Sequence, residues 1–137
     1  MSYMDILKAQ LAIDEGRENK MYYDSMRVPS IGIGHNLRDN PISDAAVDQI
    51  FADDIAPVEA ECRALFTNFD ALSDVRKAVV MNMCFNMGEG GLSTFTTFIH
   101  LVATSQFDAA ADDMKTTAWY RQVGERAVRL AAAMRAG

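Results

Sequence analysis

The hydrophobic positions near the start of the chain follow a helical period. Met4, Leu7 and Leu11 are spaced as on one face of a helix, which predicts a first helix from about Tyr3 to Glu15. Gly16 follows directly, and glycine is the residue best suited to the C-terminal cap of a helix. The chain therefore begins with one helix that has a defined end.

The period then changes over a short region. Lys20–Asp24 and Ser30–Gly34 are short and rich in tyrosine, isoleucine and glycine, and Val28–Pro29 lies between them. This pattern is typical of short strands joined by a turn. It predicts a small β-hairpin or meander, and no other part of the chain carries a convincing strand pattern.

From Ser43 onward the pattern is helical to the end of the chain. Ser43 is a good N-cap for a helix with one apolar stripe, and Pro57 should kink or break that helix near Asp53. The chain should continue helically through Leu65. We expect further helices, with a loop at Gly90–Gly91, over Ser73–Met87 (closed by Gly88), Thr94–Ala103, Phe107–Lys115, Thr117–Val123 and Glu125–Arg135.

These elements predict an α+β, mostly α fold within a single domain of 137 residues. The expected small lobe covers about residues 14–55. The expected helical lobe covers about residues 56–137 and includes the N-terminal helix. A cleft between two such lobes is a natural substrate site.

Composition and charge narrow the function. The net charge of −6 and the scattered basic residues argue against nucleic-acid binding. Cys62 and Cys84 lie in apolar helical patterns without metal-ligand spacing, so we expect two reduced, buried thiols rather than a disulfide. Met1–Asp14 lacks the pattern of a secretory leader, and no stretch is apolar enough for stable membrane insertion. We expect synthesis in a bacterial cytoplasm.

Two carboxyl groups in unlike positions are the candidate chemistry. Glu15 would lie in the last turn of the first helix, where the helix dipole and burial in a cleft both favour a protonated carboxyl. Asp24 ends a polar strand and should stay ionised. Such a pair can cut a glycosidic bond. Taken alone, the spacing is more typical of a solvated surface glutamate and a turn aspartate than of a catalytic pair.

The full pattern is more specific. The chain resembles the phage-type lysozymes, family 24 of the glycoside hydrolases, including those of the T-even phages. The resemblance covers nearly the whole chain in order. It is carried by Asp14-Glu15-Gly16, Tyr22, Asp24, Ser30-Ile31-Gly32-Ile33-Gly34-His35, Asp74-Val75-Arg76-Lys77-Ala78, Asn82-Met83, Phe85-Asn86-Met87-Gly88-Glu89, Trp119-Tyr120, Gln122, Arg126-Ala127 and Arg129.

The resemblance implies a lysozyme-like two-lobed fold and three catalytic residues. Glu15 would be the general acid, and Asp24 would position or activate the attacking water. Ser30 stands where the family usually has threonine, and its hydroxyl would help to hold that water. The alternative for Ser30 is a strand residue with an idle hydroxyl.

The resemblance also implies supporting roles. Substrate contacts would come from Gly34, Asn86 and Trp119, although Trp119 fits a plain core aromatic equally well. Arg126 would pair with Glu15, and Asn82 and Arg129 would support the site. An ion pair of His35 and Asp54 would stabilise the small lobe. The His35–Asp54 pair is inferred only from the positions that match the family pattern.

The implied function is hydrolysis of the β-1,4 bond between N-acetylmuramic acid and N-acetylglucosamine in peptidoglycan, with inversion and well-separated carboxyls. No cofactor or metal is implied. We expect a monomer that acts on peptidoglycan strands of the cell wall after release, with possible help from a holin. The alternatives are a lytic transglycosylase and a catalytically silent wall-binding module of the same fold.

Overall fold

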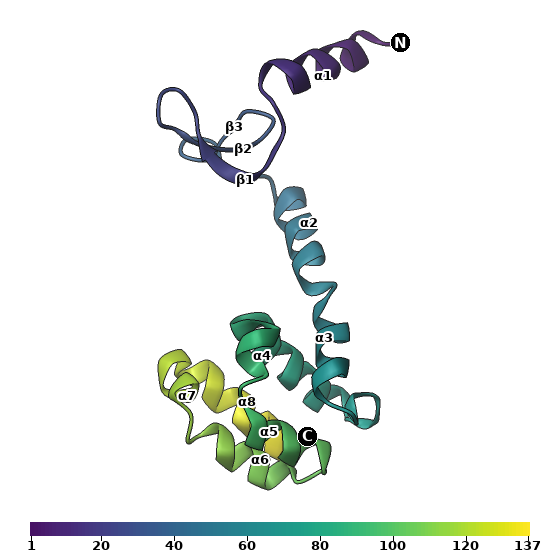
Figure 1. Ribbon diagram of the computed structural model, residues 1–137, viewed down its shortest axis with the longest axis vertical. Coiled ribbons are helices and arrows are strands. Elements are labelled where there is room, and N and C mark those ends of the chain that lie inside the picture. Colours follow the sequence, from purple (N-terminus) through teal and green to yellow (C-terminus); the bar gives the residue numbers. More distant parts are fainter. The chain divides into compact units, whose positions relative to one another are not determined.

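The computed structural model describes residues 1–137, and these form two compact units, Met1–Ile50 and Phe51–Gly137. Figure 1 labels the helices and strands along the chain, and each unit is described by itself. The fold is α+β and mostly α. Its helices are α1 Tyr3–Asp14, α2 Asp44–Ile55, α3 Val58–Leu65, α4 Asp74–Leu92, α5 Thr96–Ala103, α6 Phe107–Met114, α7 Ala118–Val123 and α8 Glu125–Ala136, with a 3₁₀ turn at Phe69–Ala71.

The first helix has defined caps at both ends. The Ser2 hydroxyl accepts the Asp5 N–H, and the Ser2 N–H donates to the Asp5 carboxylate at 3.0 Å. The Ser2 hydroxyl also donates to the Asp5 carboxylate at 2.7 Å, and this bond, together with the bond from the Ser2 N–H, lowers the pKa of Asp5. At the other end, Glu15 is the C-cap and Gly16 takes a positive φ of 76°. Gly16 thus ends the helix as expected.

The sheet has three antiparallel strands in the order β1-β2-β3. They are β1 Glu18–Tyr23, β2 Pro29–Gly32 and β3 His35–Asn36. The register pairs Tyr22 with Ser30 and Ser30 with Asn36, so Ser30 lies at the middle of the sheet. The predicted strand region is confirmed, and the third strand makes it a meander rather than a single hairpin.

The break before Pro57 comes slightly later than predicted. Ser43 caps α2 as expected, since its hydroxyl accepts the Ala46 N–H at 3.2 Å. The helix runs to Ile55 because the Ala56 N–H still donates to Ala52, whereas Pro57 has no N–H to continue the ladder. Pro57 then becomes the N-cap of α3.

The predicted end of the long helix at Gly88 is confirmed as a break in α4. Gly88 leaves helical geometry, with φ 78° and ψ 161°, and a second short helical segment follows it and ends at Leu92. The predicted loop at Gly90–Gly91 was wrong, because both residues lie in this second helical segment.

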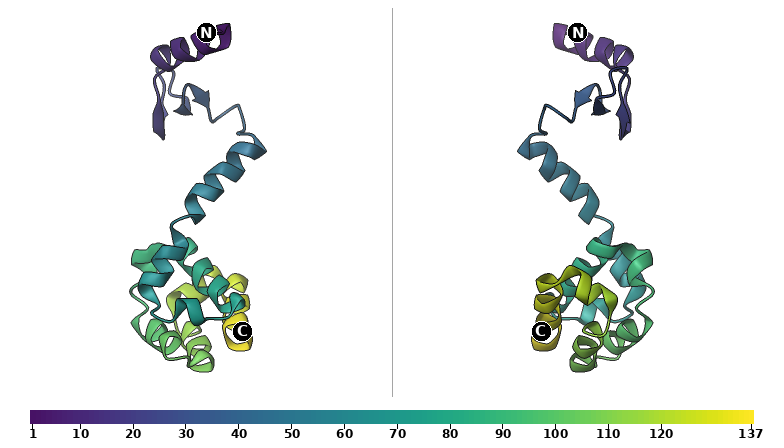
Figure 2. Two further views of the ribbon diagram at one scale, coloured as in Figure 1. Left: turned by 90° about the vertical axis from the view of Figure 1, so that its right-hand side faces the viewer. Right: turned by 90° about the vertical axis from the view of Figure 1, so that its left-hand side faces the viewer.

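The apolar core belongs to one unit. Every buried hydrophobic residue lies in Phe51–Gly137, where α4, α6 and α7 pack against α8, α3 packs on α4, and α5 packs on α6. Figure 2 shows these helices gathered closely around one another. The largest fully buried side chains are Phe66, Phe69, Phe98, Met83, Leu92, Met114 and Met134. In Met1–Ile50, Ser30 is the single buried residue.

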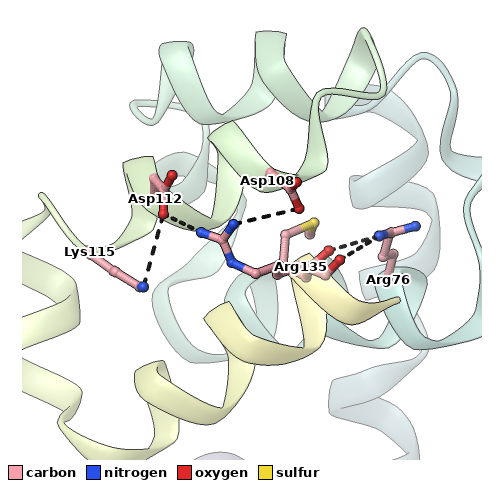
Figure 3. Close-up of polar contacts among 6 residues, drawn as sticks. Arg76, Asp108, Asp112, Lys115 and Arg135 are labelled. Carbon is pink, nitrogen blue, oxygen red and sulfur yellow. Dashed lines mark hydrogen bonds and ion pairs between the residues drawn. The ribbon is translucent and has the colours of Figure 1, made fainter.

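Polar contacts fasten the C-terminal helix to its neighbours (Figure 3). Arg135 on α8 pairs with Asp112 and lies 3.7 Å from Asp108, both on α6. Arg76 on α4 donates to the backbone carbonyls of Met134 at 2.8 Å and Arg135 at 3.0 Å. These contacts satisfy carbonyls at the end of α8 that lack helical partners.

The two cysteines are free thiols in this core, as expected. Cys62 and Cys84 are 0% and 1% exposed, and the Cys84 thiol donates to the Glu61 carboxylate at 3.3 Å. Burial raises the pKa of Cys62 to about 11 and that of Cys84 to about 12. Separately, no helix combines the length and the apolar character that a membrane crossing requires.

Candidate active site

Glu15 lies where the first helix ends and approaches the backbone of Gly34. A Cβ placed on Gly34 would come within 2.9 Å of Glu15 Oε2, closer than real Cβ contacts allow. Gly34 also has a φ of 70°, which favours glycine. The neighbour of Gly34 is thus the Glu15 side chain, and the substrate contact expected of Gly34 stays a prediction.

Asp24 holds the turn that follows β1. Its Oδ1 accepts backbone N–H bonds from Met26 at 2.8 Å and from Val28 at 2.9 Å. The Asp24 N–H donates to the Val28 carbonyl at 3.0 Å, so the turn closes on itself. The second carboxylate oxygen, Oδ2, makes no hydrogen bond within the protein. One oxygen of Asp24 therefore fixes the carboxylate and the other is available to a water.

Ser30 is tied to the same turn. It is 3% exposed, and its hydroxyl donates to the Val28 carbonyl at 3.1 Å. Val28 thus bonds to Asp24 through its N–H and its carbonyl, and to Ser30 through its carbonyl. The donated proton leaves the lone pairs of the Ser30 oxygen as acceptors. The water-holding role of Ser30 stays a prediction.

His35 has a local partner. Its Nε2 lies 3.0 Å from the carbonyl oxygen of Asn40, in the same unit. The expected partner, Asp54, belongs to the other unit, so the His35–Asp54 ion pair stays a prediction. The contact with Asn40 closes the loop after β3 without any carboxylate.

Asn82 and Arg126 lie together in the helical unit. Arg126 Nε and Nη2 donate to Asn82 Oδ1 at 2.9 Å and 2.6 Å. Both side chains border a groove of about 440 Å³ whose other lining residues are Phe51, Ile55, Val58, Ala78, Met81 and Phe85. A guanidinium with one edge fixed keeps Nη1 available for a carboxylate.

Trp119 packs as a core aromatic and orients Asn86. The indole is 7% exposed and meets Phe95 edge to face, with ring centroids 6.4 Å apart. Its Nε1 donates to Asn86 Oδ1 at 2.8 Å. Asn86 is exposed, and the bond to Trp119 uses its Oδ1. Substrate contact by either residue stays a prediction.

The remaining supporting residue, Arg129, is exposed on α8 and forms no hydrogen bond or ion pair. Its expected role stays a prediction. No group of three or more histidine, cysteine, aspartate or glutamate side chains is arranged to hold a metal ion.

Sequence reasoning missed the residues that build the Asp24 turn. Val28 supplies only backbone groups, and its side chain gives no sign of a functional role. Arg38 was also missed, although its Nη2 donates to the Arg27 carbonyl at 3.0 Å. No periodic pattern links these two arginines, so only the fold could show the contact.

The chain combines a small antiparallel sheet followed by packed helices with a glutamate at the end of the first helix and an aspartate after the first strand, an arrangement consistent with a lysozyme-like fold. The family model described as "Phage lysozyme" matches residues 12–135, so the chain belongs to the phage lysozyme family. It is accordingly a glycoside hydrolase with activity of the lysozyme type.

Curated relatives agree with this family. The chain is 24% identical over 160 residues to probable T4-type lysozyme 1 of Dictyostelium discoideum, with 96% of this chain and 94% of that protein covered. It is 25% identical to probable T4-type lysozyme 2 of the same organism, with the same coverage. It is also 25% identical to the pre-baseplate central spike protein Gp5 of Enterobacteria phage T4, covering 85% of this chain but only 25% of Gp5.

Proposed function

We propose that this lysozyme hydrolyses the β-1,4 bond between N-acetylmuramic acid and N-acetylglucosamine in bacterial peptidoglycan, with inversion. The main support is the unlike setting of its two carboxylates. Glu15 lies at the C-terminal end of α1 beside Gly34, whereas Asp24 Oδ1 accepts two backbone N–H bonds. Inverting hydrolysis needs one carboxyl as an acid and one carboxylate as a base.

In the proposed reaction, Glu15 gives its proton to the glycosidic oxygen as the bond from C1 to that oxygen breaks. A water attacks C1 from the opposite face, and Asp24 Oδ2 accepts the proton that this water loses. Ser30 would accept a hydrogen bond from the same water. Glu15 ends as a carboxylate and Asp24 as an acid, and proton exchange with solvent resets both groups.

Arg126 would pair with Glu15 and favour its charged form after the proton has left. The Asn82 amide holds the guanidinium by Nε and Nη2, which supports this role because Nη1 remains a donor. Arg126→Gln should then slow hydrolysis and move the alkaline limb of its pH profile to higher pH, because the general acid Glu15 would lose a cation that favours its charged form. A profile unchanged by Arg126→Gln would remove the pair from the proposal.

We also propose that α1 joins the helical lobe in the working enzyme. Within its own unit α1 buries none of its side chains, and Leu7 and Leu11 are 42% and 40% exposed. Leu7→Lys should therefore lower stability and activity, whereas Ile13→Lys, at a position 83% exposed, should change neither. Equal effects of the two variants would contradict this packing.

The central experiment is digestion of purified peptidoglycan, followed by NMR of the first products and mass spectrometry of the released fragments. Inversion at a β bond yields the α-anomer first. Glu15→Gln should abolish product formation, and Asp24→Asn should leave only a small residual rate. The β-anomer first would overturn inversion. Anhydro-sugar ends would indicate a lytic transglycosylase, and no fragments at all would indicate a silent wall-binding module.

Partner and location are proposed from family membership. The enzyme would be made in a host cytoplasm and would reach peptidoglycan once a holin has opened the membrane. It would act as a monomer. Cells that express the enzyme together with a holin should lyse, whereas cells that express it without a holin should only accumulate it. Light scattering of the purified enzyme should give the mass of a single chain. Lysis without a holin, or a dimer mass, would contradict these points.

A further inference from the structure

Arg38 connects the segment after β3 to the turn that carries Asp24. Its guanidinium Nη2 donates to the backbone carbonyl of Arg27 at 3.0 Å, between residues eleven positions apart. Both residues lie in Met1–Ile50. Arg38 thus links the segment after β3 to the turn after β1.

The turn that receives this bond fixes the Asp24 carboxylate. The Arg27 N–H donates to the Asp24 carbonyl at 2.9 Å, and the neighbouring N–H groups of Met26 and Val28 donate to Oδ1. Arg27 has a positive φ of 61°, which a residue with a side chain adopts only at a cost. A contact that holds Arg27 therefore stabilises the conformation in which both N–H groups point at Asp24.

The other end of the contact is itself held firmly. Asn36 Oδ1 accepts the N–H groups of Arg38 at 2.9 Å and Asp39 at 3.0 Å, and Asn36 Nδ2 donates to the Asp39 carboxylate. Asn36 lies in β3 and pairs with Ser30 of the central strand. Arg38 is thus anchored to the sheet, and through Arg27 it connects the Asp24 turn to that sheet.

We propose that Arg38 is a positioning residue for Asp24: by holding the Arg27 carbonyl, it keeps the turn closed and the Asp24 carboxylate aimed at the attacking water. The inference rests on the proposed role of Asp24 as the base. Arg38 itself does not touch the reacting atoms.

The test compares Arg38→Ala, Arg38→Lys and the control Arg121→Ala in steady-state hydrolysis of soluble peptidoglycan fragments. Arg121 is exposed on α7, makes no hydrogen bond or ion pair, and its removal changes the net charge equally. Loss of one exposed hydrogen bond should lower kcat about three- to tenfold, with KM unchanged. Arg38→Lys should recover part of the rate, and Arg121→Ala should match the wild type.

A double-mutant cycle shows whether Arg38 acts through Asp24. In the Asp24→Asn background, Arg38→Ala should have no further effect on the residual rate. Amide hydrogen exchange gives a second measurement that does not depend on activity. The amides of Met26 and Val28 should exchange faster in Arg38→Ala than in the wild type or in Arg121→Ala.

Three results would overturn the inference. These are an unchanged kcat, a raised KM with normal kcat, which would indicate direct substrate contact, and unchanged exchange at Met26 and Val28. If the wild type hydrolyses nothing, the proposed function fails by itself, while the exchange measurement still reports whether Arg38 holds the turn.

Discussion

Replacing Gly34 with alanine should separate the catalytic role of this glycine from its backbone strain. The new Cβ would lie 2.9 Å from Glu15 Oε2, 3.1 Å from Cδ and 3.2 Å from Cγ, so the carboxyl group must move. Gly32→Ala is the matched control. It has nearly the same φ, 69° against 70°, yet its Cβ would meet nothing within 4 Å.

The magnitudes follow from these two differences. Both variants place alanine in the left-handed region and should lose about 1 to 2 kcal/mol of unfolding free energy. Only Gly34→Ala displaces Glu15 from its place beside the sheet. A misplacement on the order of 1 Å costs about a hundredfold in rate when a proton donor must meet a bond in one geometry.

Urea unfolding and steady-state hydrolysis of peptidoglycan fragments would measure the two effects separately. We expect similar losses of stability in both variants and a large loss of kcat in Gly34→Ala only. Equal kinetic losses would mean that backbone strain, rather than contact with Glu15, explains the glycine. Full activity of Gly34→Ala would show that the position of Glu15 in this structure is irrelevant to catalysis.

Four further predictions concern stability and reactivity. Trp119→Phe replaces the indole by a smaller ring and removes the donor to Asn86. It should cost more than the about 1 kcal/mol of the hydrogen bond alone in urea unfolding, because the side chain is buried, and no loss would contradict both contributions. Arg27→Gly should gain about 0.5 to 1 kcal/mol by relieving a φ of 61°, and a loss would contradict the strain. Because burial raises the pKa values of Cys62 and Cys84 to about 11 and 12, neither thiol should react with a disulfide reagent at pH 8 until the protein unfolds. Since the folded pKa values lie above the unfolded value of about 9, the contribution of these thiols to the free energy of unfolding is complete below pH 9 and should decrease as the pH rises toward 11. Cys62→Ala should make this decrease smaller.

Local rules recovered much of the fold from the sequence. Ser43 was predicted as an N-cap, and its hydroxyl accepts the Ala46 N–H three residues on. Gly16, Pro57 and Gly88 marked helix ends because each acts on the backbone within one turn. The helical segment over Gly90 and Gly91 was not predicted, because it runs against the local preference of glycine and only the folded chain shows it.

For the same reason, the site could be predicted only in part from the sequence. Glu15 and Asp24 could be named from a pattern, and the resemblance added Asn82 beside Arg126, which the hydrogen bonds join. The contact between Arg38 and Arg27 depends on the path of the chain around the sheet. A sequence pattern carries no information about such a path, so positioning contacts of this kind appear only in the structure.

The uneven distribution of the core has a consequence for the working life of the enzyme. The large buried side chains lie in α3–α8, whereas Glu15 and Asp24 are held mainly by turns, caps and a few strand bonds. Segments with few buried apolar contacts open with the least free energy. Heat or mild denaturant should therefore abolish hydrolysis under conditions in which α3–α8 are still folded.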